Sequence, residues 1–258
     1  MRPQNCDIDL SVIDLKRRAL LGLFFFALLT AAQAQEPFAY RRAFEELRDA
    51  VYDNRPLEQI EAWYPEAVSV VRAGELEEQD RLYWLSRLEY MLGRAYQGHK
   101  DKRQAAEHYQ AGLDYARRAL GLGEFSEGWR MMAENQGQLC LVKEMGYLLA
   151  NGPRGPQYAQ KALKLDPLNI AAQIYLASAK VYPPPIAGGN PARGIELYRR
   201  ALALEPTEKD DLFNIYSGIG VGLGKLSRNA EAADWLRKAL ELYPNNTYAL
   251  QELARIGG

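Results

Sequence analysis

The chain has 258 residues, of which 32 are lysine or arginine and 33 are aspartate or glutamate, so its formal charge at pH 7 is −1. This balance argues against nucleic acid or an anionic membrane surface as the main partner, because both attract strongly basic proteins. The length suits one substantial domain or a short array of repeats, and no alternating strand pattern occurs along it.

The N-terminal segment differs in composition from the rest of the chain. Residues 16–18 are basic, residues 19–30 are uncharged and largely apolar, and residues 32–34 have a small-x-small pattern. Together these features predict a signal peptide over 1–34, with Gln35 as the new N-terminus. The apolar run is too short to span a bilayer comfortably as a stable helix. We therefore expect a periplasmic or secreted protein with no stable membrane span, or an anchored one if the signal stays uncleaved.

The segment before the basic residues is unusual for a leader. Asp7, Asp9 and Asp14 stand where basic residues are usual. This suggests that translation begins downstream, near Val12 or Leu15, at a non-standard start codon.

Beyond the leader, helical patterns follow one another with short breaks. We expect a helix over 38–53 and another over 57–72, in which Pro65 implies a kink or a later start. The pattern over residues 126–151 predicts one long helix or a compressed hairpin. A short helix is expected over 158–165.

Two segments carry a clear helix-turn-helix pattern. The first is 86–122, in which Leu92, Gly93 and Tyr96 form the first half of a repeat signature. The second is 213–246, where apolar and small residues recur on one face of each helix: Tyr216, Ile219, Gly220, Leu223, Ala232, Leu236 and Ala239. Gly220 has no side chain to keep a partner helix away, so we expect the two helices to approach closely there.

A third hairpin is expected over 170–206. Near-identical segments end at Pro167, Pro206 and Pro244, at intervals of 39 and 38 residues. A final helix over 247–256 is expected to cap the array, with Leu250 and Leu253 facing inward.

These motifs resemble the tetratricopeptide repeat (TPR) family, over 157–250 and over 80–122. The resemblance implies an all-α superhelix of stacked helical hairpins over residues 35–258. It also implies a concave groove that binds peptides or other ligands. The face of each first helix that points away from the core would line this groove: Arg87, Tyr90, Arg94, Gln97, Ile174, Ser178, Tyr182, Asn214, Ser217, Val221 and Lys225.

Residues 182–190 are an insert relative to the standard repeat. Its prolines favour stiff extended backbone, and Asn190 can cap the following helix. One interpretation is a rigid connector that holds two helices apart. The other is a ridge at the groove mouth, where Tyr182, Pro184 and Ile186 contact a ligand.

Patterns of catalytic residues are absent from the sequence. His99 and His108 have no accompanying metal-ligand motif. The glycine-rich run 218–225 fails the phosphate-loop pattern and lies inside a predicted helix. Gly222 would tolerate alanine if it is exposed there. We therefore expect no enzyme activity, no cofactor and no metal.

Two functions fit these observations. The first is a scaffold or adaptor that binds a protein or peptide in its groove, without nucleic acid. The second is a small-molecule-binding accessory of a periplasmic transport system, since the chain also looks like the TPR proteins that accompany tripartite (TRAP-type) transporters. Those relatives are commonly lipoproteins, whereas Cys6 falls in the leader and Cys140 is remote from the cleavage point. A groove lined by charges and tyrosine would favour a peptide, and a closed apolar tunnel would favour a hydrophobic small molecule.

Overall fold

The regular structure of the described residues is entirely helical. The computed structural model describes residues 38–257, so the signal peptide expected over 1–34 and its cleavage point lie outside the described residues. The elements are α2 (Ala39–Tyr52), α3 (Leu57–Ala73), α4 (Glu78–Gly98), α5 (Lys102–Leu122), α6 (Ser126–Val142), α7 (Met145–Asn151), α8 (Arg154–Leu165), α9 (Ile170–Val181), the 3-10 turn η1 (Pro185–Ala187), α10 (Pro191–Leu202), α11 (Lys209–Lys225), α12 (Asn229–Leu242) and α13 (Thr247–Arg255). None of these helices is long and apolar enough to cross a bilayer.

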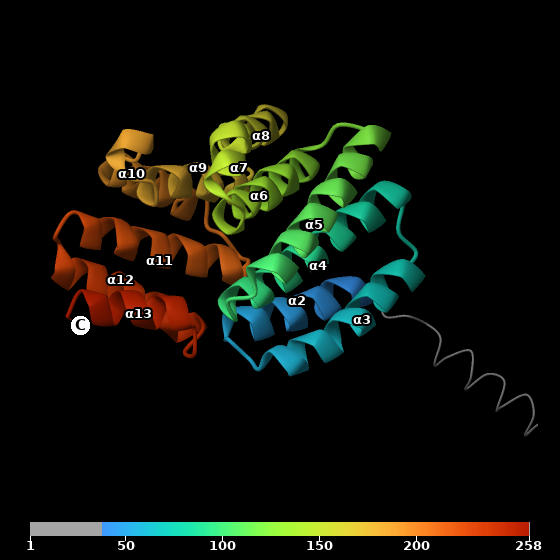
Figure 1. The fold of residues 1–258 in the computed structure, drawn as a ribbon, viewed down its shortest axis with the longest axis horizontal. Coiled ribbons are helices and arrows are strands. Elements are labelled where there is room, and N and C mark those ends of the chain that lie inside the picture. Colours follow the sequence, from blue (N-terminus) through green and yellow to red (C-terminus); the bar gives the residue numbers. More distant parts are fainter. Residues whose placement is uncertain (1–37, 258) are drawn as a thin grey trace, which may run out of the picture. The chain divides into compact units, whose positions relative to one another are not determined.

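Helices from α4 onward pack as successive hairpins (Figure 1). The pairs are α4 with α5, α6 with α8, α9 with α10, and α11 with α12, while α7 lies in the connection between α6 and α8. Neighbouring hairpins contact each other, and α13 packs on α12 at the end of the array. The all-α fold of stacked, TPR-like hairpins expected from the sequence is thus confirmed.

The glycines of the repeat signature lie where the two helices of a hairpin meet. A Cβ atom on Gly220 would lie 2.7 Å from Cγ of Leu236 and 3.1 Å from the carbonyl oxygen of Ala232. A Cβ on Gly93 would lie 2.7 Å from the ring of Tyr109. Contacts this short leave no room for a side chain, which explains why glycine stands at both positions.

Some expected details differ from the structure. Helix α3 runs through Pro65 from its start at Leu57, so the later start does not occur. The 126–151 stretch is divided between α6 and α7. In α13, Leu250 is 44% exposed rather than inward, and the fully buried residue is its neighbour Ala249. A short helix buries a narrow face, and a small residue there allows α13 to pack closely on α12.

Helix α2 stands apart from the hairpin pattern. It lies between α3 and α4 on one side and the ends of α11 to α13 on the other (Figure 1). Its apolar face is buried, with Phe44 and Leu47 each 1% exposed and Tyr52 2% exposed. The helix therefore packs against both early and late parts of the array, and this position defines the candidate site.

The glycines of α11 give a first prediction, because the exposure on which tolerance of alanine at Gly222 depended does not occur. Gly222 is buried, and a Cβ there would lie 2.7 Å from Cγ1 of Ile195 on the neighbouring α10. Gly222→Ala should therefore destabilise the fold by about 1–3 kcal/mol through overpacking. Gly121→Ala is the matched control, since Gly121 is a helical glycine with nothing within 4 Å of its added Cβ. That variant should be neutral or up to about 1 kcal/mol more stable. Denaturant unfolding of both variants measures the difference, and equal effects would contradict the packing described here.

Candidate functional site

Aromatic rings attach α2 to α4. The ring of Phe44 lies 5.5 Å from that of Trp84, edge to face. The guanidinium of Arg87 stands 3.8 Å from the centre of the Phe44 ring. Such cation–π and aromatic pairs add to the apolar burial, so this contact is both apolar and electrostatic.

Tyr52, at the C-terminal end of α2, contacts both ends of the array. Its hydroxyl oxygen accepts hydrogen bonds from Arg94 of α4 (3.1 Å) and from Asn214 of α11 (2.9 Å). Its ring packs 5.3 Å from Phe213 and 5.0 Å from Tyr243. One buried side chain thus joins the first full hairpin to the last.

Ion pairs reinforce the same junction. The side chain of Arg48 is only 6% exposed, and its Nη1 lies 3.0 Å from Glu208 and 3.2 Å from Asp210 at the start of α11. Asp49 accepts a hydrogen bond of 2.8 Å from the hydroxyl of Tyr243. Burial alone would raise the pKa of Asp49, but the hydrogen bond from Tyr243 and the charge of Arg48 lower it. The charged form of Asp49 is therefore stabilised in the folded protein.

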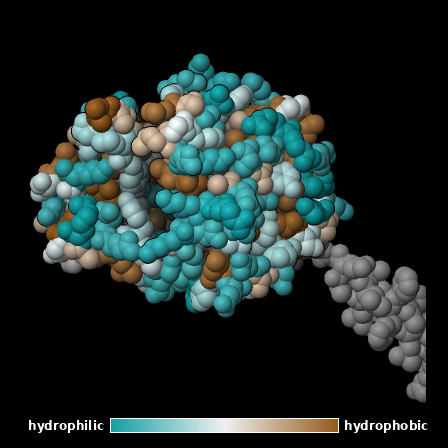
Figure 2. Space-filling view, viewed as in Figure 1, coloured by the Kyte–Doolittle hydropathy of each residue, from teal (hydrophilic) through white to brown (hydrophobic). Residues whose placement is uncertain are grey.

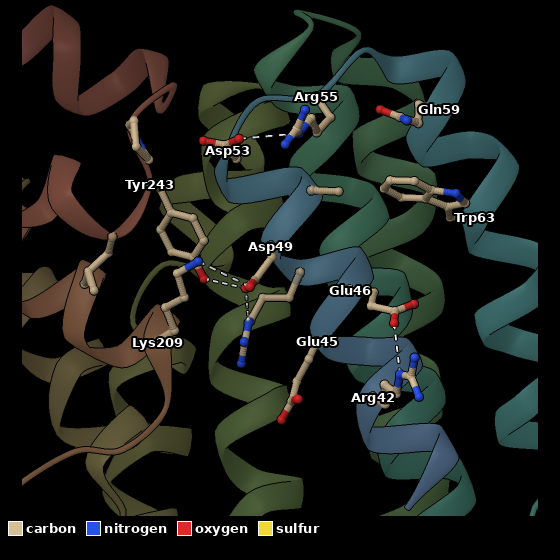
Figure 3. Close-up of a pocket in the computed structure, with 14 residues that line it drawn as sticks. Arg42, Glu45, Glu46, Asp49, Asp53, Arg55, Gln59, Trp63, Lys209 and Tyr243 are labelled. Carbon is tan, nitrogen blue, oxygen red and sulfur yellow. Dashed lines mark hydrogen bonds and ion pairs between the residues drawn. The ribbon is translucent and has the colours of Figure 1, made fainter. Parts of the chain in front are cut away.

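A cavity of about 720 Å³, here called the outer cavity, opens on the solvent side of α2 (Figure 3). It is lined by residues of α2, α3, α11 and the end of α12: Arg42, Glu45, Glu46, Arg48, Asp49, Ala50, Asp53, Arg55, Gln59, Trp63, Lys209, Leu242, Tyr243 and Pro244. Several of its charges pair with one another, including Arg42 with Glu46 (3.1 Å) and Lys209 with Asp49 (3.3 Å). These groups therefore already have charged partners within the cavity wall.

A second cavity, here called the inner cavity, has a volume of about 390 Å³. Residues from α2, the first helix of every hairpin and the segment before α9 line it: Arg41, Tyr52, Tyr83, Arg87, Tyr90, Met91, Glu127, Arg130, Met131, Glu134, Asp166, Leu168, Asn169, Ile170, Ala171, Ile174, Glu208, Asp210, Asp211 and Asn214. Because every hairpin contributes, the cavity exists only in the assembled array.

The α6 side of the inner cavity is a closed network of charges. Arg130 is buried and donates to Glu127 (2.6 Å) and to Glu134 (2.9 Å). Burial alone would raise the pKa of Glu127, but the charge and hydrogen bonding of Arg130 lower it. Burial raises the pKa of Glu134 despite the same arginine. Asn169 donates a further hydrogen bond of 2.7 Å to Glu127.

Asp211, on the α11 side, is different. Its carboxylate makes no hydrogen bond or ion pair with any residue between 38 and 257. Burial and the neighbouring charge of Asp210 raise the pKa of Asp211 to about 7. Among the carboxylates that line the inner cavity, Asp211 is therefore the one that has neither a hydrogen bond nor an ion pair with the described residues.

The structure brings together some of the groove residues expected from the sequence. Arg87, Tyr90, Ile174 and Asn214 line the inner cavity. Arg94 does not line it but contacts Tyr52, which does, with its guanidinium 4.5 Å from the centre of the Tyr52 ring. The four lining residues come from three different hairpins, and whether they contact a ligand stays a prediction.

Other expected lining residues face elsewhere. Gln97 accepts a hydrogen bond from Tyr109 of α5, and it therefore packs inside its own hairpin. Ser217 and Val221 are each 3% exposed, against the expectation of a solvated face, because α11 packs on α9 as well as on α12. Lys225 donates to the carbonyl oxygen of Val181 at the end of α9. Ser178 donates to a backbone carbonyl of α9 itself.

The insert lies at the other end of α9 from the inner cavity. Its Asn190 caps α10, as expected, by accepting a hydrogen bond of 3.0 Å from the backbone of Arg193. Tyr182 is 41% exposed, Ile186 is 98% exposed, and Pro184 also lies at the surface. Ile174 and Tyr182 are eight residues apart, which is about 12 Å along a helix. Neither described cavity includes the insert, and a ligand contact there stays a prediction.

Sequence reasoning missed the charged half of the inner cavity. Glu127, Arg130 and Glu134 stand three and four residues apart on α6, a spacing that places them on one helix face. Their pattern was readable in the sequence. Asp211 carried no comparable signal, because acidic residues in the first turn of a helix are ordinary.

Comparisons with known proteins find similarity in fold only. No family model matches the chain, and no curated protein matches it. A solved thermophilic TPR protein from Thermus thermophilus is 16% identical, with a TM-score of 0.48 over 78% of this chain and 90% of that one. YrrB, described as a TPR protein with an unusual peptide-binding site, is also 16% identical, with a TM-score of 0.35 over 88% of this chain and 96% of that one.

The face of this chain shown in Figure 2 intersperses hydrophilic and hydrophobic residues, so a contact surface there would be mixed in character.

The junction at Tyr52 gives a second prediction. Tyr52→Phe keeps the ring but removes the oxygen that accepts from Arg94 and Asn214, so the variant should lose about 1–2 kcal/mol of stability. Tyr96→Phe is the control, since the hydroxyl of Tyr96 donates to Glu61 at the surface, and it should cost less than about 0.5 kcal/mol. Thermal unfolding compares the two. An unchanged midpoint for Tyr52→Phe would mean that α2 is not held through this hydroxyl.

Proposed function

We propose that the chain is a non-enzymatic helical-repeat scaffold that binds a protein or peptide partner at the inner cavity. The observation that carries this proposal is the lining, to which each of the four hairpins from α4 onward contributes and which combines tyrosines with charged side chains. A surface of this kind can contact both the backbone and the side chains of a peptide.

The polarity of the cavity favours a peptide over a hydrophobic small molecule. Its lining includes three arginines and six carboxylates, whereas a hydrophobic ligand is best held by an enclosed apolar pocket. A transport accessory that binds a hydrophobic molecule would need an enclosed apolar pocket, and neither the outer nor the inner cavity is one. No group of three or more potential metal ligands occurs in residues 38–257.

The volume limits what the cavity can hold. About 390 Å³ lies near the lower end of the range for ligand pockets, so it accommodates one or two side chains rather than a whole peptide. Helix α2 already covers part of the face formed by α4 and α11. The partner would therefore place a side chain or chain end in the cavity and lie on the exposed rim beside it.

We also propose that the protein acts outside the cytoplasm, on the strength of the leader at 1–34. N-terminal sequencing of protein recovered from the periplasm or medium should find Gln35 as the first residue.

Filling the inner cavity tests the binding proposal and gives a third prediction. Ala171 lines the cavity from α9, so Ala171→Phe should occupy space without deleting a contact. Ala192→Phe is the matched control, on the exposed face of α10 and outside both cavities. The readout is retention of the purified protein on an array of blocked decapeptides with the central residue varied. We expect Ala171→Phe to weaken retention by about tenfold or more, since burying a ligand side chain contributes about 1.5–3 kcal/mol, and Ala192→Phe to leave it unchanged. An array that retains no wild-type protein, or equal retention by all three proteins, would reject the proposal.

A further inference from the structure

We propose that the inner cavity takes a basic side chain, lysine or arginine, from the bound peptide, and that Asp211 is the carboxylate that pairs with it. This inference rests on the proposed function and names the chemistry of the same site.

The first step is the balance of charge in the cavity. Its lining includes more carboxylates than cations: Glu127, Glu134, Asp166, Glu208, Asp210 and Asp211, against Arg41, Arg87 and Arg130. An excess of negative charge in a partly enclosed cavity attracts a cation more strongly than it would in open water.

The second step is that the other carboxylates have contacts of their own. Arg130 binds both Glu127 and Glu134. Arg48, from the far side of α2, binds Glu208 and Asp210. The carboxylate of Asp166 accepts a hydrogen bond from a backbone N–H in its own turn. Within the described residues this leaves Asp211.

The third step concerns Arg87, because Arg87 and Arg130 are the lining cations whose charges act on Asp211, and Arg130 is already paired with two glutamates. The third lining arginine, Arg41, makes no ion pair with Asp211. The guanidinium of Arg87 stands 3.8 Å from the centre of the Phe44 ring and 4.9 Å from that of Trp84. No ion pair joins it to Asp211 in the part of the chain that the structure describes. The aromatic rings of α2 and α4 therefore hold Arg87 away, and the position opposite Asp211 is open to a ligand.

The fourth step is the electrostatic environment of Asp211. Asp210 on the same helix and Glu134 on α6 disfavour its charge, whereas Arg130 on α6 and Arg87 on α4 favour it more weakly than burial opposes it. With a pKa of about 7, the carboxyl is only partly ionised at neutral pH. An incoming ammonium or guanidinium group would stabilise the ionised form, so binding of the cation releases a proton.

The remaining walls suit the stem of a basic side chain. Rings of Tyr52, Tyr83 and Tyr90 line the cavity, together with Ile174. Lysine and arginine carry aliphatic stems that pack on apolar and aromatic surface while their charged heads reach a polar partner. A neutral side chain of the same length would keep the packing but lose the pairing.

The test uses the blocked pentapeptide acetyl-Ala-Ala-Xaa-Ala-Ala-amide, with lysine, arginine, norleucine or glutamate at the central position. NMR titration of the full protein measures each affinity. We expect the lysine and arginine peptides to bind wild type at least about tenfold more tightly than the norleucine peptide, which has a stem of lysine-like length without the charge. Asp211→Asn should remove this difference. Asp234→Asn, an exposed aspartate of α12 outside both cavities, should retain it.

The pH dependence gives a second readout. Because the ionised fraction of a group with a pKa of about 7 rises nearly tenfold between pH 6 and pH 8, wild-type affinity for the lysine peptide should rise by a similar factor. The affinity of Asp211→Asn should stay flat over this range. Equal binding of all four peptides, unchanged by Asp211→Asn, would overturn the inference and leave the proposed function standing. Absence of binding by every peptide would overturn both.

Stability provides the folding control. The pKa of Asp211 is raised above its unfolded value, so this group costs stability progressively as pH rises from about 4 through about 7. Asp211→Asn removes that cost, and its melting temperature should exceed that of wild type by a margin that grows between pH 4 and pH 8. A margin that does not grow would contradict the environment assigned to Asp211.

Discussion

The contact of α2 with both ends of the helical array is the constraint on which the rest of the structure depends. In a stack of hairpins each unit touches only its neighbours, so early and late repeats have no direct means of holding each other. Here Tyr52 bonds to Asn214, and Arg48 bonds to Glu208, across 162 and 160 positions of sequence. Because Tyr52 and Arg48 are buried, truncating either side chain within the folded protein would leave polar partners without their hydrogen bonds, which is costly.

The position of α2 also separates the outer cavity from the inner cavity. Residues on one side of α2 line the outer cavity and those on the other side line the inner cavity. Asp49, in the outer cavity, lies within hydrogen-bonding or ion-pairing reach of Tyr243, Arg48 and Lys209. Asp211, in the inner cavity, has no such partner in the described residues. Asp49 is thus held in a network of partners on one side of α2, whereas Asp211 on the other side is largely buried among the hairpins without such a partner, and the inner cavity is the better candidate for a ligand.

The sequence predicts the hairpins well because their information is local. Gly220 meets Leu236 as the repeat spacing predicts, and Asn190 caps its helix as predicted. The position of α2 was not predictable, because an amphipathic pattern shows that the apolar face of a helix is buried but not which element covers it. Val221 was misassigned for a related reason. A helix inside an array packs on two neighbours, so its buried arc is wider than the stripe that one hairpin requires. Which carboxylates find partners depends on contacts between helices far apart in sequence.

The difference between Glu134 and Asp211 shows how this packing produces a site. Burial raises the pKa of both carboxyls, yet Glu134 has the guanidinium of Arg130 at 2.9 Å, whereas Asp211 forms no ion pair with a cation of the described residues. A buried carboxyl without a cation partner, such as Asp211, can stay neutral and so avoid the free-energy cost of burying a charge. It can ionise when a cation arrives. Arg87 does not fill the place of that cation, because its guanidinium lies over the ring of Phe44 on α2 and that of Trp84 on α4. Helix α2 thus contributes to the open position at Asp211, through Phe44 against Arg87 and through Tyr52 in the cavity wall, so any ligand that pairs with Asp211 would depend on α2 being in place.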